Sequence, residues 1–68
     1  MKLSEYHRQY EQIMKMAPGW GRDRRLAELM TMMEKEYRIP LLRDPEWEKK
    51  NRAVIALYRK ISMSRTMI

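Results

Sequence analysis

The sequence contains no cysteine at any of its 68 positions. Without that residue the chain forms no disulfide, has no thiolate nucleophile and holds no zinc ion through cysteine sulfur. It also lacks any run of about 18 apolar residues, and its first residues lack the continuous apolar stretch of a signal peptide. We therefore expect a soluble, cytoplasmic protein that does not enter a membrane.

Strand-like alternation of apolar and polar residues is missing over any useful length. The chain is long enough for one small domain, because a chain of roughly 60 residues hides only about 60% of its unfolded surface on folding. A deep catalytic cleft would consume much of so small a core. We expect a single helical domain over residues 1–68.

Apolar residues recur at spacings of three and four, which predicts three amphipathic helices over about residues 5–17, 23–38 and 45–62. Short connections join them, so the sequence predicts an all-α fold, a small antiparallel three-helix bundle. The alternative is an open array of helices that completes its core by dimerisation. Eight methionines keep this alternative open, because methionine packs well but specifies a unique arrangement poorly.

Capping residues mark the expected ends of the helices. Ser4 and Asp23 are expected to cap the first two helices. Asp44 followed by Pro45 is the clearest start signal in the chain, since proline is favoured at the first helical position. Pro40 disfavours a helical conformation at the residue before it, so the second helix should end there.

The apolar stripes of the three helices predict a shared core of Tyr6, Tyr10, Ile13, Leu26, Met30, Met33, Trp47, Val54, Tyr58 and Ile61. Replacing Trp47 by alanine should then cost about 3 to 5 kcal/mol. Leu41 and Leu42, in the connection before the third helix, should lie against this core. Trp20 stands between two glycines and should cover one end of the bundle as a lid, with an exposed anchor for a partner as the alternative.

The chain offers little that resembles a catalytic or metal site. His7 is the only histidine and lies four residues before Glu11, so the two side chains can meet on one helical turn. A zinc site needs more ligands than this pair, and no serine or threonine has a basic partner at an activating spacing. We expect no enzyme activity, no catalytic or metal-ligating residue and no cofactor.

The charges of the chain are unevenly distributed. Lys and Arg minus Asp and Glu give +3 over residues 1–27, −3 over residues 28–48 and +6 over residues 49–68, for a total of +6. Such an excess of bases favours acidic partners.

One candidate for binding is the basic face of the third helix. A helical wheel places Lys49, Arg52, Arg59 and Lys60 opposite the apolar stripe, where a partner could dock. The alternative is purely structural. Glu48 pairs with Arg52 four residues later, and the bases near the helix end oppose the negative end of the helix dipole.

A second basic cluster lies at the start of the second helix, where Arg22, Arg24 and Arg25 oppose the helix dipole. Free backbone N–H groups there, together with the arginine side chains, could hold a phosphate or a carboxylate. Alternatively, Asp23 occupies those N–H groups and the arginines pair with Glu28.

These features predict a small non-catalytic helical protein that binds another protein, as an adaptor, regulator or subunit. The two basic clusters and Trp20 are the candidate contacts, and their charge favours an acidic partner. The alternative function is nucleic-acid binding through phosphate contacts. A helix-turn-helix is not expected, because the connection before the third helix lacks glycine and that helix starts with Glu46 and Glu48, where phosphate repulsion is worst. Homodimerisation is a further expectation.

Overall fold

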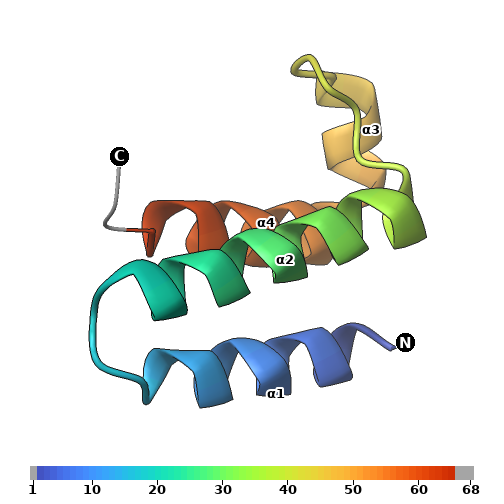
Figure 1. Cartoon of the computed structure of the whole chain (residues 1–68). Coiled ribbons are helices and arrows are strands. Elements are labelled where there is room, and N and C mark those ends of the chain that lie inside the picture. Colours follow the sequence, from blue (N-terminus) through green and yellow to red (C-terminus); the bar gives the residue numbers. More distant parts are fainter. Residues whose placement is uncertain (1, 66–68) are drawn as a thin grey trace.

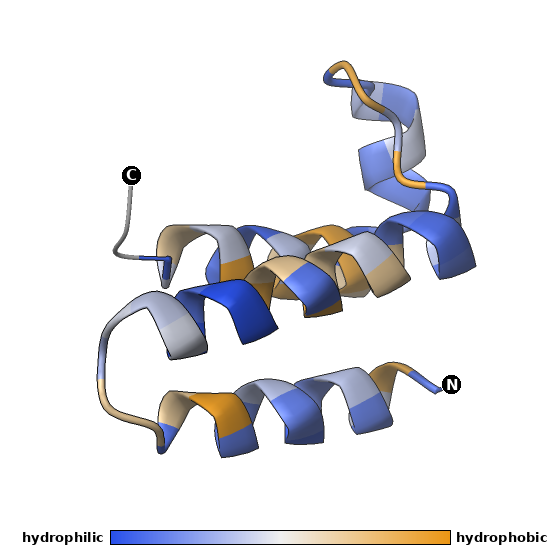
Figure 2. Cartoon of the chain, viewed as in Figure 1, coloured by the Kyte–Doolittle hydropathy of each residue, from blue (hydrophilic) through white to orange (hydrophobic). Residues whose placement is uncertain are grey.

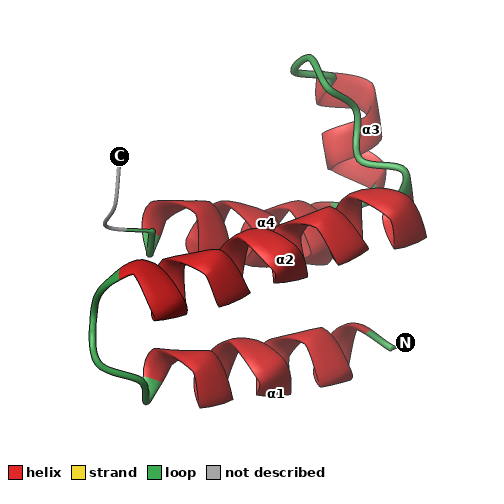
Figure 3. Cartoon of the chain, in the orientation of Figure 1, coloured by secondary structure: helices red, strands yellow, loops and turns green. Residues whose placement is uncertain are grey.

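Three helices of the computed structural model lie side by side and run in alternating directions, and a short fourth helix leaves the bundle at one end (Figure 1). The structure describes residues 2–65. Its helices are α1 (Leu3–Met14), α2 (Trp20–Tyr37), α3 (Pro45–Lys50) and α4 (Arg52–Met63). α2 packs against both α1 and α4, which also touch each other. No strand occurs among the described residues (Figure 3), so the expected all-α bundle is confirmed.

α1 begins at Leu3, before the expected cap Ser4, because Glu5 reaches back to the start of the helix. Oε1 of Glu5 accepts a hydrogen bond from the backbone N–H of Lys2 at 3.5 Å. An acid in the first turn also interacts favourably with the helix dipole. The capping prediction for Ser4 is therefore wrong. The helix ends at Met14, earlier than expected, because the next two backbone N–H groups bond three residues back and tighten the chain into a turn.

α2 begins at Trp20 because Gly19 turns the chain there. Gly19 has a φ of +148°, which residues with a side chain rarely adopt. The expected cap Asp23 lies inside the first turn instead, and its side chain is buried. Oδ2 of Asp23 accepts a hydrogen bond from Nε of Arg65 at 3.3 Å. The capping prediction for Asp23 is therefore wrong, and its carboxylate joins the start of α2 to the chain after α4.

The continuous helix expected over residues 45–62 is wrong, because Asn51 divides it into α3 and α4. The start is as expected, since Oδ1 of Asp44 accepts a hydrogen bond from the backbone N–H of Trp47 at 3.1 Å. Nδ2 of Asn51 donates to the backbone oxygen of Trp47 at 2.8 Å. An uninterrupted helix would give that acceptor to the backbone N–H of Asn51. Asparagine competes with the helix in this way, so the chain turns and α3 points away from α4 (Figure 1).

The buried core consists of Tyr6, Tyr10, Ile13, Leu26, Leu29, Met33, Val54, Leu57 and Ile61. Three other expected core residues, Met30, Trp47 and Tyr58, are only partly buried and pack against it. In both α2 and α4, one expected core residue is only partly buried and the residue before it is buried instead. Leu29 takes the place of Met30, and Leu57 takes the place of Tyr58.

Two tyrosine hydroxyls join the outer helices to α2. Tyr6 of α1 donates to Oε1 of Glu36 at 3.0 Å, and Tyr58 of α4 donates to Oε2 of Glu34. Burial, as the larger cause, and the hydrogen bond to a carboxylate, as the second, raise the pKa of Tyr6 and of Tyr58 to about 12. Both bonds lie near the C-terminal end of α2 and hold α1 and α4 against it.

The connection between α2 and α3 carries large apolar side chains that remain in solvent. Leu41 is 100% exposed and Leu42 is 83% exposed, so the expectation that both lie against the core is wrong. Ile39 does pack against the core, but the chain then leaves the bundle to reach α3, which no longer continues α4. Figure 2 shows apolar segments along this connection. None of the helices within residues 2–65 is both long and apolar enough to cross a membrane.

Candidate binding surface

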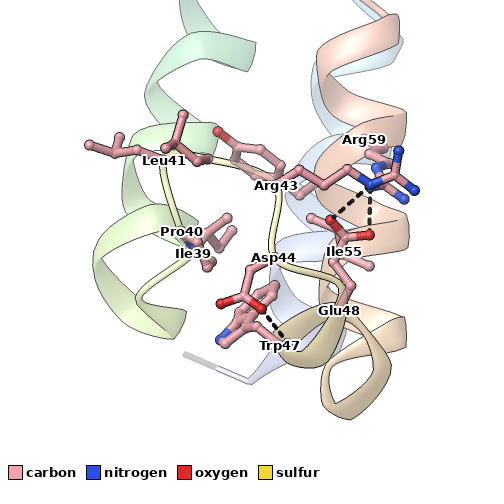
Figure 4. Close-up of a pocket in the computed structure, with 11 residues that line it drawn as sticks. Ile39, Pro40, Leu41, Arg43, Asp44, Trp47, Glu48, Ile55 and Arg59 are labelled. Carbon is pink, nitrogen blue, oxygen red and sulfur yellow. Dashed lines mark hydrogen bonds and ion pairs between the residues drawn. The ribbon is translucent and has the colours of Figure 1, made fainter.

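An apolar pocket of about 180 Å³ lies between the connection, α3 and α4 (Figure 4). Its apolar lining consists of Ile39, Pro40, Leu41, Leu42, Trp47, Ile55 and Tyr58. Arg43, Asp44, Glu48 and Arg59 supply its polar lining. The turn at Asn51 brings α3, α4 and the connection to this one pocket.

A wider hollow of about 410 Å³ lies between α3 and α4. Among the described residues that line it, the bases are Arg43, Lys49, Arg52 and Arg59, and Glu48 is the one acid. This basic groove shares Arg43, Glu48, Ile55 and Arg59 with the apolar pocket. We call the pocket and the groove together the candidate surface. It combines exposed apolar area with an excess of positive charge.

Glu48 lies where the pocket and the groove meet. Its Oε1 is 2.7 Å from Nη2 of Arg59, and its Oε2 is 4.0 Å from Nε of Arg43. The side chain of Glu48 is only 16% exposed, whereas that of Arg59 is 51% exposed and that of Arg43 is 79% exposed. A sheltered carboxylate requires a close partner, and Arg59 supplies it. Arg59 therefore helps to hold α3 against α4, while Arg43 extends into solvent.

Three of the bases predicted for the third helix meet in the groove. Lys49 comes from α3, and Arg52 and Arg59 come from α4. The expected pairing of Glu48 with Arg52 is replaced by its pairing with Arg59 and Arg43, because the break at Asn51 changes the direction of α3. The predicted basic face is therefore assembled from two helices and the connection before them.

Lys60 does not join these bases. It lies above the ring of Tyr10, with Nζ 5.4 Å from the ring centroid, a distance at which a cation interacts with an aromatic face. It lines a different hollow, of about 270 Å³, between α1 and α4. The hydroxyl of Tyr10 lies 2.7 Å from Oγ of Ser64, so Lys60 covers a contact between α1 and the end of α4.

The three arginines at the start of α2 have different surroundings. Arg24 pairs with Glu28 at 4.0 Å, as the structural alternative expects. Arg25 lines a hollow of about 210 Å³ together with Arg8 of α1, and Arg22 is partly buried. Arg22 and Arg25 are three residues apart and share one side of the helix, whereas Arg24 projects from another side. Anion binding by the three arginines stays a prediction.

Trp20 is the first residue of α2 and is 75% exposed, so the prediction that it forms a lid is wrong. Gly19 and the start of the helix hold it outside the packed region. It lies at the opposite end of α2 from the candidate surface (Figure 1). Its role as an exposed anchor for a partner stays a prediction.

Leu41, Leu42 and Arg43 belong to the candidate surface although the sequence pattern did not predict it. The available signal was the position of the two leucines in a short segment between Pro40 and Pro45. The four residues between these prolines are too few for a stable helix. Whether their side chains reach the core depends on the route that the backbone takes from α2 to α3. That path depends on the direction of α3.

His7 and Glu11 meet on α1 as expected, with Nδ1 of the histidine 3.6 Å from Oε1 of the glutamate. The histidine side chain is 48% exposed and the glutamate side chain 63% exposed. Among residues 2–65 no group of three or more His, Cys, Asp or Glu residues is arranged to hold a metal ion. The pair is an ordinary surface contact between neighbouring turns.

Comparisons of this chain with protein family models, with curated proteins and with solved structures found no match. The chemistry of the candidate surface is therefore the basis for a functional proposal.

Proposed function

We propose that the protein acts by binding another protein through the candidate surface, as an adaptor, regulator or subunit. The observation that carries this proposal is the exposure of Leu41, at 100%, and of Leu42, at 83%. Removal of apolar surface from water is favourable both in folding and in association. Full burial of one leucine contributes about 1.5 to 3 kcal/mol. Both leucines stay in water in the folded chain, so a partner that covers them stabilises the complex by their burial.

The same two side chains favour a protein over a nucleic acid as the partner. Nucleic-acid contacts go mostly to phosphate and sugar, and they are made by bases, polar side chains and backbone N–H groups. Leucine offers nothing to a phosphate. Nucleic-acid binding through phosphate contacts is the alternative that the experiment distinguishes.

Capture from a native extract by immobilised wild-type protein tests the proposal when it is compared with a Leu41→Ser/Leu42→Ser variant. Met63→Ser is the control, because Met63 is 81% exposed and does not line the candidate surface. A photoreactive amino acid at position 41 then shows whether the captured protein touches the connection. Every capture is repeated after nuclease treatment.

The expected result is a protein that wild type and Met63→Ser capture, that resists nuclease, that crosslinks to position 41 and that the leucine variant loses. Capture that is equal for all three proteins would show that the leucines are not the contact. Capture that disappears with nuclease would favour the nucleic-acid alternative.

A further inference from the structure

We infer that the partner segment is acidic and that it inserts one large apolar side chain into the apolar pocket. This inference rests on the proposed function and adds the chemistry of the partner to it. The pocket and the groove are contiguous, since Arg43, Ile55 and Arg59 line both. One short segment therefore reaches apolar and basic groups at the same time.

The pocket sets the size of the inserted side chain. Its volume of about 180 Å³ is close to the about 150 Å³ of an engineered apolar cavity that accepts benzene. Ile39, Trp47 and Ile55 supply apolar lining from the connection, α3 and α4 (Figure 4). One leucine or phenylalanine side chain fills such a space. Leu41 and Leu42 form the exposed part of the lining, where they meet the neighbouring residues of the partner.

The groove sets the charge that flanks the inserted side chain. Its four bases and one acid leave a net charge of +3 among the described lining residues. Arg59 is balanced by Glu48 at 2.7 Å, whereas Lys49 and Arg52 are exposed. Opposite charges across an interface steer association and reject partners of like charge. Carboxylates on either side of the inserted side chain match this groove.

The charge also disfavours a second copy of the chain as the occupant through a symmetric contact between the two grooves. Two copies that met at the groove would bring four bases from each chain together, and like charges across an interface are strongly unfavourable. The net charge of +6 on each chain adds to this repulsion. An acidic segment of another protein replaces the repulsion with attraction.

Synthetic peptides of about 15 residues provide defined probes. The first peptide is rich in glutamate and contains one leucine, the second has alanine in place of that leucine, and the third has lysine in place of every glutamate. Each is titrated into ¹⁵N-labelled protein at physiological salt, and a random DNA duplex is titrated in the same way. The indole N–H signals of Trp47, in the pocket, and of Trp20, at the other end of α2, report the place of binding.

The first peptide should shift the signal of Trp47 and leave that of Trp20 in place. The alanine peptide and the lysine peptide should bind at least about tenfold more weakly, because each loses one of the two kinds of contact. Arg52→Glu should weaken the first peptide by at least about tenfold. Arg8→Glu is the matched control, since it makes the same change of charge on α1 and leaves the groove intact.

The inference is overturned if the lysine peptide binds as tightly as the first, if Arg8→Glu weakens binding as much as Arg52→Glu, or if Trp20 shifts instead of Trp47. Tighter binding of the DNA duplex also overturns it. Extract capture that depends on Leu41 and Leu42 but not on Arg52 would leave the proposed function standing and refute only the acidic partner. Capture that is independent of the leucines would refute both.

Discussion

Replacement of Leu26 by alanine should destabilise the protein more than replacement of Trp47 by alanine. Leu26 is completely buried in α2, the helix that contacts both α1 and α4. Trp47 is partly buried on α3, and among the described helices α3 contacts α4 alone. Side-chain size, and the continuous third helix expected from the sequence, predict the opposite order. The pair of variants therefore tests the break at Asn51.

The structure supplies the magnitudes. Leu26→Ala removes three carbon atoms, and at about 0.8 kcal/mol for each the lost transfer free energy is about 2.4 kcal/mol. The cavity left in a closed core raises the loss to about 3 to 4 kcal/mol. At about 0.05 to 0.15 kcal/mol per residue, 68 residues have a total stability of about 3 to 10 kcal/mol. Trp47→Ala leaves a space that opens to solvent, so its loss should be about 1 to 2 kcal/mol instead of about 3 to 5.

Urea unfolding followed by far-ultraviolet circular dichroism measures both losses. Leu42→Ala is the control, because Leu42 is 83% exposed and its loss should stay within about 0.5 kcal/mol. A loss of about 3 kcal/mol or more for Trp47→Ala, or a larger loss than for Leu26→Ala, would refute the placement of Trp47 at the edge of the core.

Arg65→Ala should lower the free energy of unfolding by about 1 to 2 kcal/mol, because it removes a charged partner of the buried carboxylate of Asp23. Arg24→Ala, in an exposed pair, should hardly change it, and urea unfolding of the two variants makes the comparison. Alkaline pH should also destabilise the protein. The ordinary pKa of a tyrosine side chain is 10.0 and the pKa of Tyr58 in the folded protein is about 12, so its contribution is complete below pH 10 and is lost as the pH rises toward 12. Thermal unfolding measures the fall in stability over this range, which should be smaller for Tyr58→Phe than for wild type. An equal fall in the two proteins would contradict the raised pKa. Amide hydrogen exchange should be fastest in α3 among the four helices, because α3 has no buried residue; protection equal to that of α2 would contradict this.

The spacing of apolar residues was sufficient to predict the bundle. Stripes such as Leu26, Leu29 and Met33 repeat with the period of a helix, and burial follows that period whatever the caps are. The helix ends were less predictable, because the backbone turn at Gly19 and the reach of Glu5 outweighed the capping preferences of nearby residues.

The break at Asn51 left no trace in the apolar pattern. Trp47 and Val54 are seven residues apart, which is the spacing of two turns of one helix, so the pattern runs across the break. The competing interaction is the side-chain hydrogen bond from Asn51 to the backbone of Trp47. Only the identity of one residue signals it, and an asparagine within a helix often points to solvent instead.

The candidate surface was predictable only where its residues share a helix. Lys49 and Arg52 are three residues apart and Arg59 follows seven later, so one helical face already grouped them, and they lie in one groove. Arg43 lines that groove and the leucines of the connection line the adjoining pocket. Their approach depends on the direction of α3, to which the ion pair between Glu48 and Arg59 of the next helix contributes. No local pattern contains that contact.

The tyrosine hydroxyls have a consequence for how many arrangements the core can adopt. Methionine side chains such as that of Met33 adapt to many shapes, so a slightly rotated or shifted helix would bury almost as much apolar area. Hydrogen bonds from Tyr6 and Tyr58 to carboxylates of α2 have narrow limits of distance and angle, and a shift of one helical position would break them. Groups that add little apolar area thus favour one native conformation over others of similar compactness.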